Sequence, residues 1–197
     1  MRARTRATVL TAVLVTMFAG AIGRATTTDP RPGTSTAPDP TRVARGSYLV
    51  RAMGCNHCHT PFKMGQNGPE PDMSRELTGH PEALTMPPAP RLPAGPWVWM
   101  GAGTNTAFAG PWGVSFTANL TPDPETGLGR WTEETFIATM RTGRHEGKGR
   151  HILPPMPFEN IAALNDEDIR ALFAYLQSLK PVHNRVPAPI DPPEAGQ

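Results

Sequence analysis

Apolar residues recur at helical spacing in three parts of the chain, and the last part is the clearest. Asn165 is a good helix N-cap, and the acidic residues 166–168 complement the positive end of a helix. Pro181 cannot continue a helix, so the pattern predicts one helix between Asn165 and Pro181. One stripe of this helix collects Ile169, Leu172, Phe173, Leu176 and Leu179.

Two further helices are predicted, one over residues 42–53 and one from Thr132 to Gly143. In the second, Met140 shares a face with Phe136, so we expect Met140 to fill the core. The first contains Gly46, which costs a helix roughly 1 kcal/mol relative to alanine. A glycine at this cost indicates that another helix crosses closely there.

Residues 61–124 have no helical period and hold twelve of the 24 prolines. We expect short strands at residues 97–99 and 114–116, where aromatic and β-branched residues gather between glycines and prolines. A loop of this length inside a compact domain is usually functional or wraps something. This insertion therefore belongs to whatever site the chain holds.

The N-terminus predicts export. Residues 1–25 combine three early arginines with an apolar run of about 14 residues at positions 9–22, which is short for a membrane span. We read residues 1–25 as a signal peptide, with a retained membrane anchor as the alternative. Residues 26–41 are rich in Thr, Pro and Asp and predict a disordered linker. A domain over 42–186 and a Pro-rich tail over 187–197 follow.

Charge argues against nucleic acid as a partner. The full chain has 19 Lys and Arg against 17 Asp and Glu, a formal charge of +2. Four of the arginines and none of the acids lie in residues 1–25, so 15 − 17 leaves −2 for the remainder. The mature domain has no basic surplus with which to bind a phosphate backbone.

The two cysteines of the chain stand in a C-x-x-C-H run, Cys55 to His59. Two thiols at this spacing can each form a thioether with one haem, and the histidine that follows can bind the iron. This run predicts one covalently attached haem c, held by Cys55, Cys58 and His59.

Three other interpretations of the cysteine pair agree less well with the sequence. A redox disulfide requires a thioredoxin-like setting, which the residues after Cys58 do not provide. A structural zinc site requires four ligands, and no second cysteine pair exists. A structural disulfide across so short a loop would stabilise little.

The second axial ligand is predicted to be Met156. Prolines at 154, 155 and 157 stiffen the backbone around its thioether. His145 and His151 remain as alternatives for a bis-histidine iron. His/Met ligation raises the reduction potential and closes the iron to substrate, which favours electron transfer over catalysis.

At this point the chain resembles the class I cytochrome c family, over residues 42 to about 186. The resemblance rests on residues 46–50 and the C-x-x-C-H run, on 155–158 around Met156, and on 164–169, 175–176 and 179–182. Three middle runs, 108–113, 119–123 and 127–132, are similar to cytochrome c subunits of periplasmic dehydrogenases.

The resemblance implies an all-α, cytochrome c-like helical fold around one haem, with the first and last helices crossing near Gly46 and Tyr175. The insertion at 61–124 would add its short strands to this fold. His59 and Met156 would be the axial ligands. Trp131 and the segment around Asn119 would lie close to the haem. The multihaem relatives carry three haem motifs, whereas this chain carries one.

The expected function is that of a periplasmic, monohaem electron carrier or electron-transfer subunit, and not of an enzyme. Its electron donor would be a periplasmic dehydrogenase. Its acceptor would be a respiratory oxidase or another cytochrome. The alternative is a haem enzyme, such as a peroxidase or small-molecule oxidoreductase, whose sixth ligand is labile.

Overall fold

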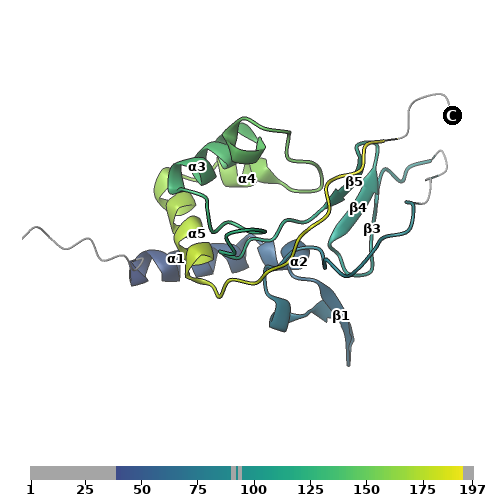
Figure 1. The fold of residues 1–197 in the computed structure, drawn as a ribbon, viewed down its shortest axis with the longest axis horizontal. Helices are drawn as coiled ribbons and strands as arrows, with labels where there is room; N and C mark the ends of the chain where they lie inside the picture. Colours follow the sequence, from purple (N-terminus) through teal and green to yellow (C-terminus); the bar gives the residue numbers. More distant parts are fainter. Residues whose placement is uncertain (1–38, 90–91, 93–94, 193–197) are drawn as a thin grey trace, which may run out of the picture. The chain divides into compact units, whose positions relative to one another are not determined.

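The computed structural model describes residues 39–89, 92 and 95–192 (Figure 1). The predicted signal peptide lies outside these residues. So do the predicted linker, apart from its last three positions, and the end of the predicted tail. Within the described residues, no helix is both long enough and apolar enough to span a membrane.

Two long helices, α1 (Pro40–Ala52) and α5 (Asp166–Ser178), cross and pack against each other. The side chain of Asp39 caps the first and that of Asn165 caps the second. At Gly46 an added Cβ would lie 1.9 Å from the carbonyl oxygen of Ala171 and 2.7 Å from the Cβ of Tyr175. The close crossing predicted at Gly46 is therefore confirmed.

A third helix matches its predicted limits, and two short helices were not predicted. The helix α3 (Glu133–Thr142) begins at the Thr132 cap, whose hydroxyl accepts a hydrogen bond from the Thr135 N–H, and ends at Gly143 in the left-handed region. The short helices are α2 (Cys55–His59) and α4 (Phe158–Ala162). Single 3₁₀ turns are η1 (Met73–Arg75) and η2 (His145–Gly147).

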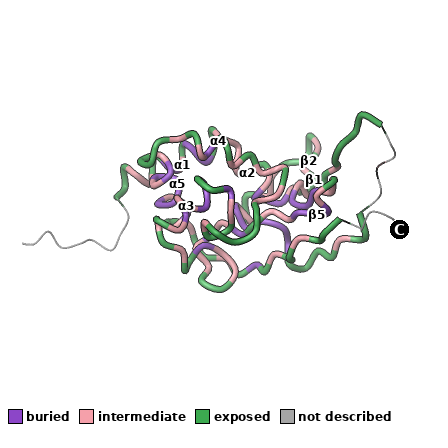
Figure 2. Tube along the Cα trace, turned by 90° about the horizontal axis from the view of Figure 1, so that it is seen from above, coloured by how far each residue is buried: buried purple, intermediate pink, exposed green. Residues whose placement is uncertain are grey.

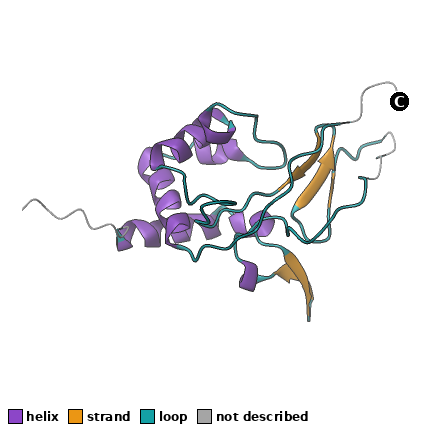
Figure 3. Ribbon diagram, viewed as in Figure 1, coloured by secondary structure: helices purple, strands orange, loops and turns teal. Residues whose placement is uncertain are grey.

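The insertion folds into two antiparallel sheets (Figure 3). One is a hairpin of β1 (Phe62–Gly65) and β2 (Gly68–Pro71). The other has the order β3-β4-β5, built from β3 (Met100–Gly101), β4 (Ala107–Gly110) and β5 (Gly113–Phe116).

The predicted all-α fold is therefore wrong: the described residues form five α-helices and two antiparallel sheets, a mixed α and β fold. The expected strand at 114–116 is present as β5. The expected strand at 97–99 is not, because regular pairing starts only at Met100. Proline and glycine disfavour a helix in this stretch. Its backbone N–H and C=O groups therefore pair between strands instead.

The core lies where α1, α3 and α5 meet (Figure 2). Phe136 and Phe173 stack with ring centroids 5.2 Å apart. Met140 is buried in the same cluster, which confirms its expected place in the core. This core holds α3 against α5, and the segment that follows α3 leads into the candidate site.

Candidate functional site

One largely apolar cavity lies between the helices and the three-stranded sheet. It is bounded by α3, the segment between α3 and α4, β5, and the residues that follow β5. Its empty space is about 1100 Å³, which includes the part open to solvent. The large apolar side chains of the lining are Phe108, Phe116, Leu120, Leu128, Trp131, Phe136, Met140, Ile152, Leu153 and Met156.

Three of the four residues predicted from sequence line this cavity: Cys58, His59 and Met156. Cys55 does not line it. Cys55 lies on α2 with Cys58 and is half-buried against the core. The fold thus brings the C-x-x-C-H run to the same cavity as a methionine almost a hundred residues later in the chain.

The single turn of α2 presents the C-x-x-C-H run. It begins at Gly54, which has a φ of +72°, a left-handed conformation that glycine adopts without steric cost. The His57 N–H then donates to the Gly54 carbonyl at 3.0 Å. Because the chain turns sharply between α1 and α2, Cys58 and His59 leave the axis of α1 and reach the cavity.

His59 is held in one tautomer by its surroundings. Its Nδ1 lies 2.8 Å from the carbonyl oxygen of Ala118, and a carbonyl only accepts, so Nδ1 carries the proton. Burial lowers the pKa of His59, against the opposing effect of this hydrogen bond, so the ring is neutral at pH 7. The lone pair therefore resides on Nε2, as metal ligation requires.

Both cysteines are free thiols rather than a disulfide. Burial raises the pKa of Cys55 to about 11 and also raises the pKa of Cys58. A redox-active C-x-x-C pair instead lowers the pKa of its attacking thiol. This environment disfavours the thioredoxin-like interpretation.

The backbone around Met156 is anchored on both sides. The Ser115 hydroxyl donates to the Pro154 carbonyl at 2.6 Å, and the Phe158 N–H donates to the Met156 carbonyl at 3.0 Å. Gly143, at the end of α3, packs closely against Phe158, two residues after Met156. Gly143 has a φ of +63°, and an added Cβ would lie 2.4 Å from the Phe158 ring. A neutral imidazole, a thioether and the Cys58 thiol line this apolar cavity, and the Cys55 thiol lies on the same helix, α2; this set of side chains fits a covalently held haem.

The two alternative ligands for the iron, His145 and His151, differ in whether they line the cavity. His145 lines the cavity and meets Trp131 edge to face, with ring centroids 5.3 Å apart. His151 is exposed and does not line the cavity. Across the part of the chain that the structure describes, no three His, Cys, Asp or Glu side chains gather into a group that could hold a metal ion, so nothing there resembles a zinc site.

Several lining residues were missed from sequence. Arg150 lies in the lining, and so do Ser115 and Pro189. The Ala118 carbonyl, which fixes His59, carries no side-chain signature and could not have been found. Trp131 and Asn119 do line the cavity, in agreement with the position that the family resemblance implied for them.

Comparison with known proteins places these features in a family. Residues 43–180 match the family model described as cytochrome c. The fructose dehydrogenase cytochrome subunit of Gluconobacter japonicus is 30% identical over 177 residues, which cover 89% of this chain and 28% of that protein. The cytochrome c subunit of the quinone alcohol dehydrogenase of Gluconobacter oxydans is 30% identical over 152 residues, covering 77% and 24%.

A shorter and stronger similarity joins the chain to a subunit of the nicotinate dehydrogenase of Pseudomonas putida, with 45% identity over 78 residues. These residues cover 40% of this chain and 6% of that protein. The chain thus spans less than a third of the length of each of these three relatives.

Proposed function

Because the chain belongs to the cytochrome c family, we propose that it is a monohaem electron-transfer protein of the periplasm. It would accept single electrons from a periplasmic dehydrogenase and pass them to a respiratory oxidase or another cytochrome. The observation that carries this proposal is the shared cavity of Cys58, His59 and Met156.

Each residue of the site has a separate role in this proposal. Cys55 and Cys58 would hold the haem through thioethers. His59 would bind the iron through Nε2 and Met156 through its sulfur. When bound, the haem supplies an iron that exchanges one electron at a time. The apolar lining would limit water around that iron, and with both His59 and Met156 bound it would have no open position for a substrate.

The choice of a dehydrogenase as donor follows from the relatives, two of which are named as cytochrome subunits of sugar and alcohol dehydrogenases. The chain has one haem motif and would hand its electron on after one step. Docking would be weak and transient, as is usual between redox partners.

We propose that the partner docks on the basic loop, residues 144–151. This loop contains three positively charged side chains, Arg144, Lys148 and Arg150, and one carboxylate, that of Glu146. Within the described residues, no acid lies within 4.0 Å of these three cations. Because Arg150 also lines the cavity, an acidic partner face on this loop would lie next to the haem.

The test is an absorption spectrum with a redox titration of the exported, purified protein. We expect c-type haem bands that sharpen on reduction, one haem per chain, and one reversible one-electron couple. Cyanide and CO should bind slowly or not at all. Absence of covalent haem would overturn the proposal, and rapid ligand binding to the native protein would replace electron transfer with haem catalysis.

A further inference from the structure

The chain beyond α5 is an ordered part of the site. Residues 181–191, here called the C-terminal strap, run from the end of α5 to the side of β5 (Figure 1). Ile190 and Val114 exchange two backbone hydrogen bonds of 2.8 and 2.9 Å, and Pro189 lines the cavity. The strap lies outside residues 43–180, the part that matches the family model.

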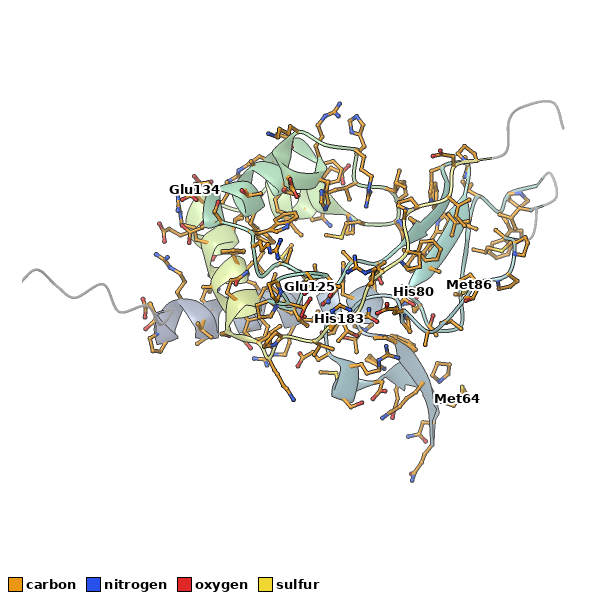
Figure 4. All side chains as sticks on the ribbon, in the orientation of Figure 1. Met64, His80, Met86, Glu125, Glu134 and His183 are labelled. Carbon is orange, nitrogen blue, oxygen red and sulfur yellow. The ribbon has the colours of Figure 1, made fainter. Side chains whose placement is uncertain are left out.

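Asn184 is the most tightly bound side chain of the strap. It is 4% exposed. Its amide nitrogen donates to the carbonyls of Thr78 and His80 at 2.7 and 2.8 Å, and its amide oxygen accepts from the Glu82 N–H at 2.9 Å. Both N–H groups and the oxygen of the amide are therefore satisfied. Figure 4 labels His80, which lies in the bound segment, and His183, the strap residue before Asn184.

The segment that Asn184 binds is also the segment that holds His59. The Gly79 N–H donates to the His59 carbonyl at 2.8 Å. The His80 N–H donates to the Thr117 carbonyl at 3.0 Å. Thr117 precedes Ala118, the acceptor of the His59 ring proton. The two segments are in direct contact, because a Cβ on Gly79 would lie 2.6 Å from the Ala118 carbonyl oxygen.

The strap also holds the residue on the other side of Ala118. The Asn119 amide donates to the Val182 carbonyl at 2.8 Å, and Thr126 accepts from both Asn119 and the Asn184 N–H. Ala118 therefore sits between two residues, Thr117 and Asn119, whose positions depend on contacts with the strap or with the segment it binds.

We propose that Asn184 is a positioning residue for His59: through residues 78–80 and 117–118 it fixes the carbonyl that receives the imidazole proton. This inference rests on the proposed haem ligation by His59. A well-aligned hydrogen bond at Nδ1 makes the imidazole a stronger donor to the metal, which favours the oxidised iron. Second-shell hydrogen bonding of this kind is one of the levers that set a haem potential.

The test compares Asn184→Ala and Asn184→Leu with the wild-type holoprotein. The leucine keeps about the volume of the asparagine and adds no charge, but removes both donors to the Thr78 and His80 carbonyls and the acceptor for the Glu82 N–H. For both variants we expect a higher midpoint potential. We also expect the His59 Nδ1 proton of the ferrous protein to exchange with deuterium about tenfold faster or more by NMR, because its acceptor is no longer fixed. If Asn184→Ala does not fold, Asn184→Leu, which leaves no cavity of that size, carries the test.

The matched control is Asn160→Ala, which removes an exposed asparagine of α4. It should change neither the potential nor the exchange rate. A lower melting temperature in the Asn184 variants with unchanged potential and unchanged exchange would show a purely structural role and overturn the inference. A wild-type protein without covalent haem would instead contradict the proposed function, so the two failures are distinguishable.

Discussion

His59 and Met156 line one cavity but are fixed by different means. His59 is buried, and the Ala118 carbonyl holds its ring proton. Met156 is half-buried, and its position depends on a backbone anchored by Ser115 and Phe158. One hydrogen bond thus fixes the orientation of the imidazole, whereas the position of the thioether follows from the backbone on either side of Met156.

At the residue scale, Met156→Ala should remove the absorption band of sulfur bound to Fe(III) while the covalent haem remains. The midpoint potential should fall, because His/Met ligation raises it. The measurement is a spectrum of the oxidised protein with a redox titration.

Met64→Ala is the matched control, because Met64 is 76% exposed at the β1–β2 hairpin (Figure 4). It should leave the band intact. Met140 also lines the cavity, so a band that survives in Met156→Ala would make Met140 the ligand instead.

The helices were predictable at the scale of elements because their signals are local. Thr132 and Asn165 cap α3 and α5 as their positions indicated. The β1–β2 hairpin was missed although Asn67 and Gly68 are an Asn-Gly dipeptide, a known hairpin signal; in the structure the two loop residues are Gln66 and Asn67, and Gly68 pairs with Gly65. Its strands, rich in proline and glycine, have no apolar alternation, so only the turn could have indicated it.

The crossing of α1 and α5 should be intolerant of any side chain at Gly46. Gly46→Ala should lower the free energy of unfolding by about 1–3 kcal/mol, because the methyl group meets the Ala171 backbone, which cannot move aside as a side chain could. Chemical denaturation measures this change.

Gly103→Ala is the control for the Gly46 variant, since an added Cβ at Gly103 has no neighbour within 4 Å. Equal stability of the two variants would show that α1 and α5 do not cross as closely as described.

The same two helices are joined by an ion pair that makes stability depend on pH. Arg45 donates to Asp168 at 2.7 and 3.1 Å, and this hydrogen bond lowers the pKa of Asp168. A lowered folded-state pKa contributes stability above the unfolded value of about 3.9, and that stability is lost as the pH falls through the folded value.

Asp168→Asn should therefore destabilise the protein at pH 7 by up to about 1 kcal/mol and flatten the acid limb of its stability curve. Melting temperatures between pH 7 and pH 3 measure both effects. Glu159→Gln, at an exposed carboxylate of α4, is the control. An acid limb of unchanged steepness in Asp168→Asn would show that this pair contributes little.

At the scale of the whole molecule, the sequence predicted the candidate ligands but not the surrounding groups that hold them in place. The C-x-x-C-H spacing and the prolines around Met156 are chemical signatures in single stretches of chain. The Ala118 carbonyl and the Asn184 amide act through backbone contacts between distant segments, and such contacts leave no residue pattern. An asparagine in the loop after Pro181 looks like any other loop residue.

The basic loop and the net charge of the chain without residues 1–25 make opposite predictions for small redox reagents. If the loop directs electron transfer, oxidation by the hexacyanoferrate(III) anion should slow as ionic strength rises, although the chain without residues 1–25 carries a formal charge of −2. Stopped-flow kinetics measures this dependence.

Lys148→Glu should slow the reaction with the anion severalfold at low salt. Lys180→Glu makes the same charge change outside the loop and should have a smaller effect. Equal effects of the two substitutions would mean that net charge, and not the loop, governs access to the haem.

The position of the strap in the chain has a consequence for how the protein is assembled. Cys55 and Cys58 come early, whereas the residues that close one side of the cavity come near the end of the described chain. Until Ile190 pairs with Val114, that side lacks Pro189. A chain whose strap has not yet paired with β5 therefore has this side of the cavity open, so late pairing of the strap would let the proposed haem enter before the wall is complete.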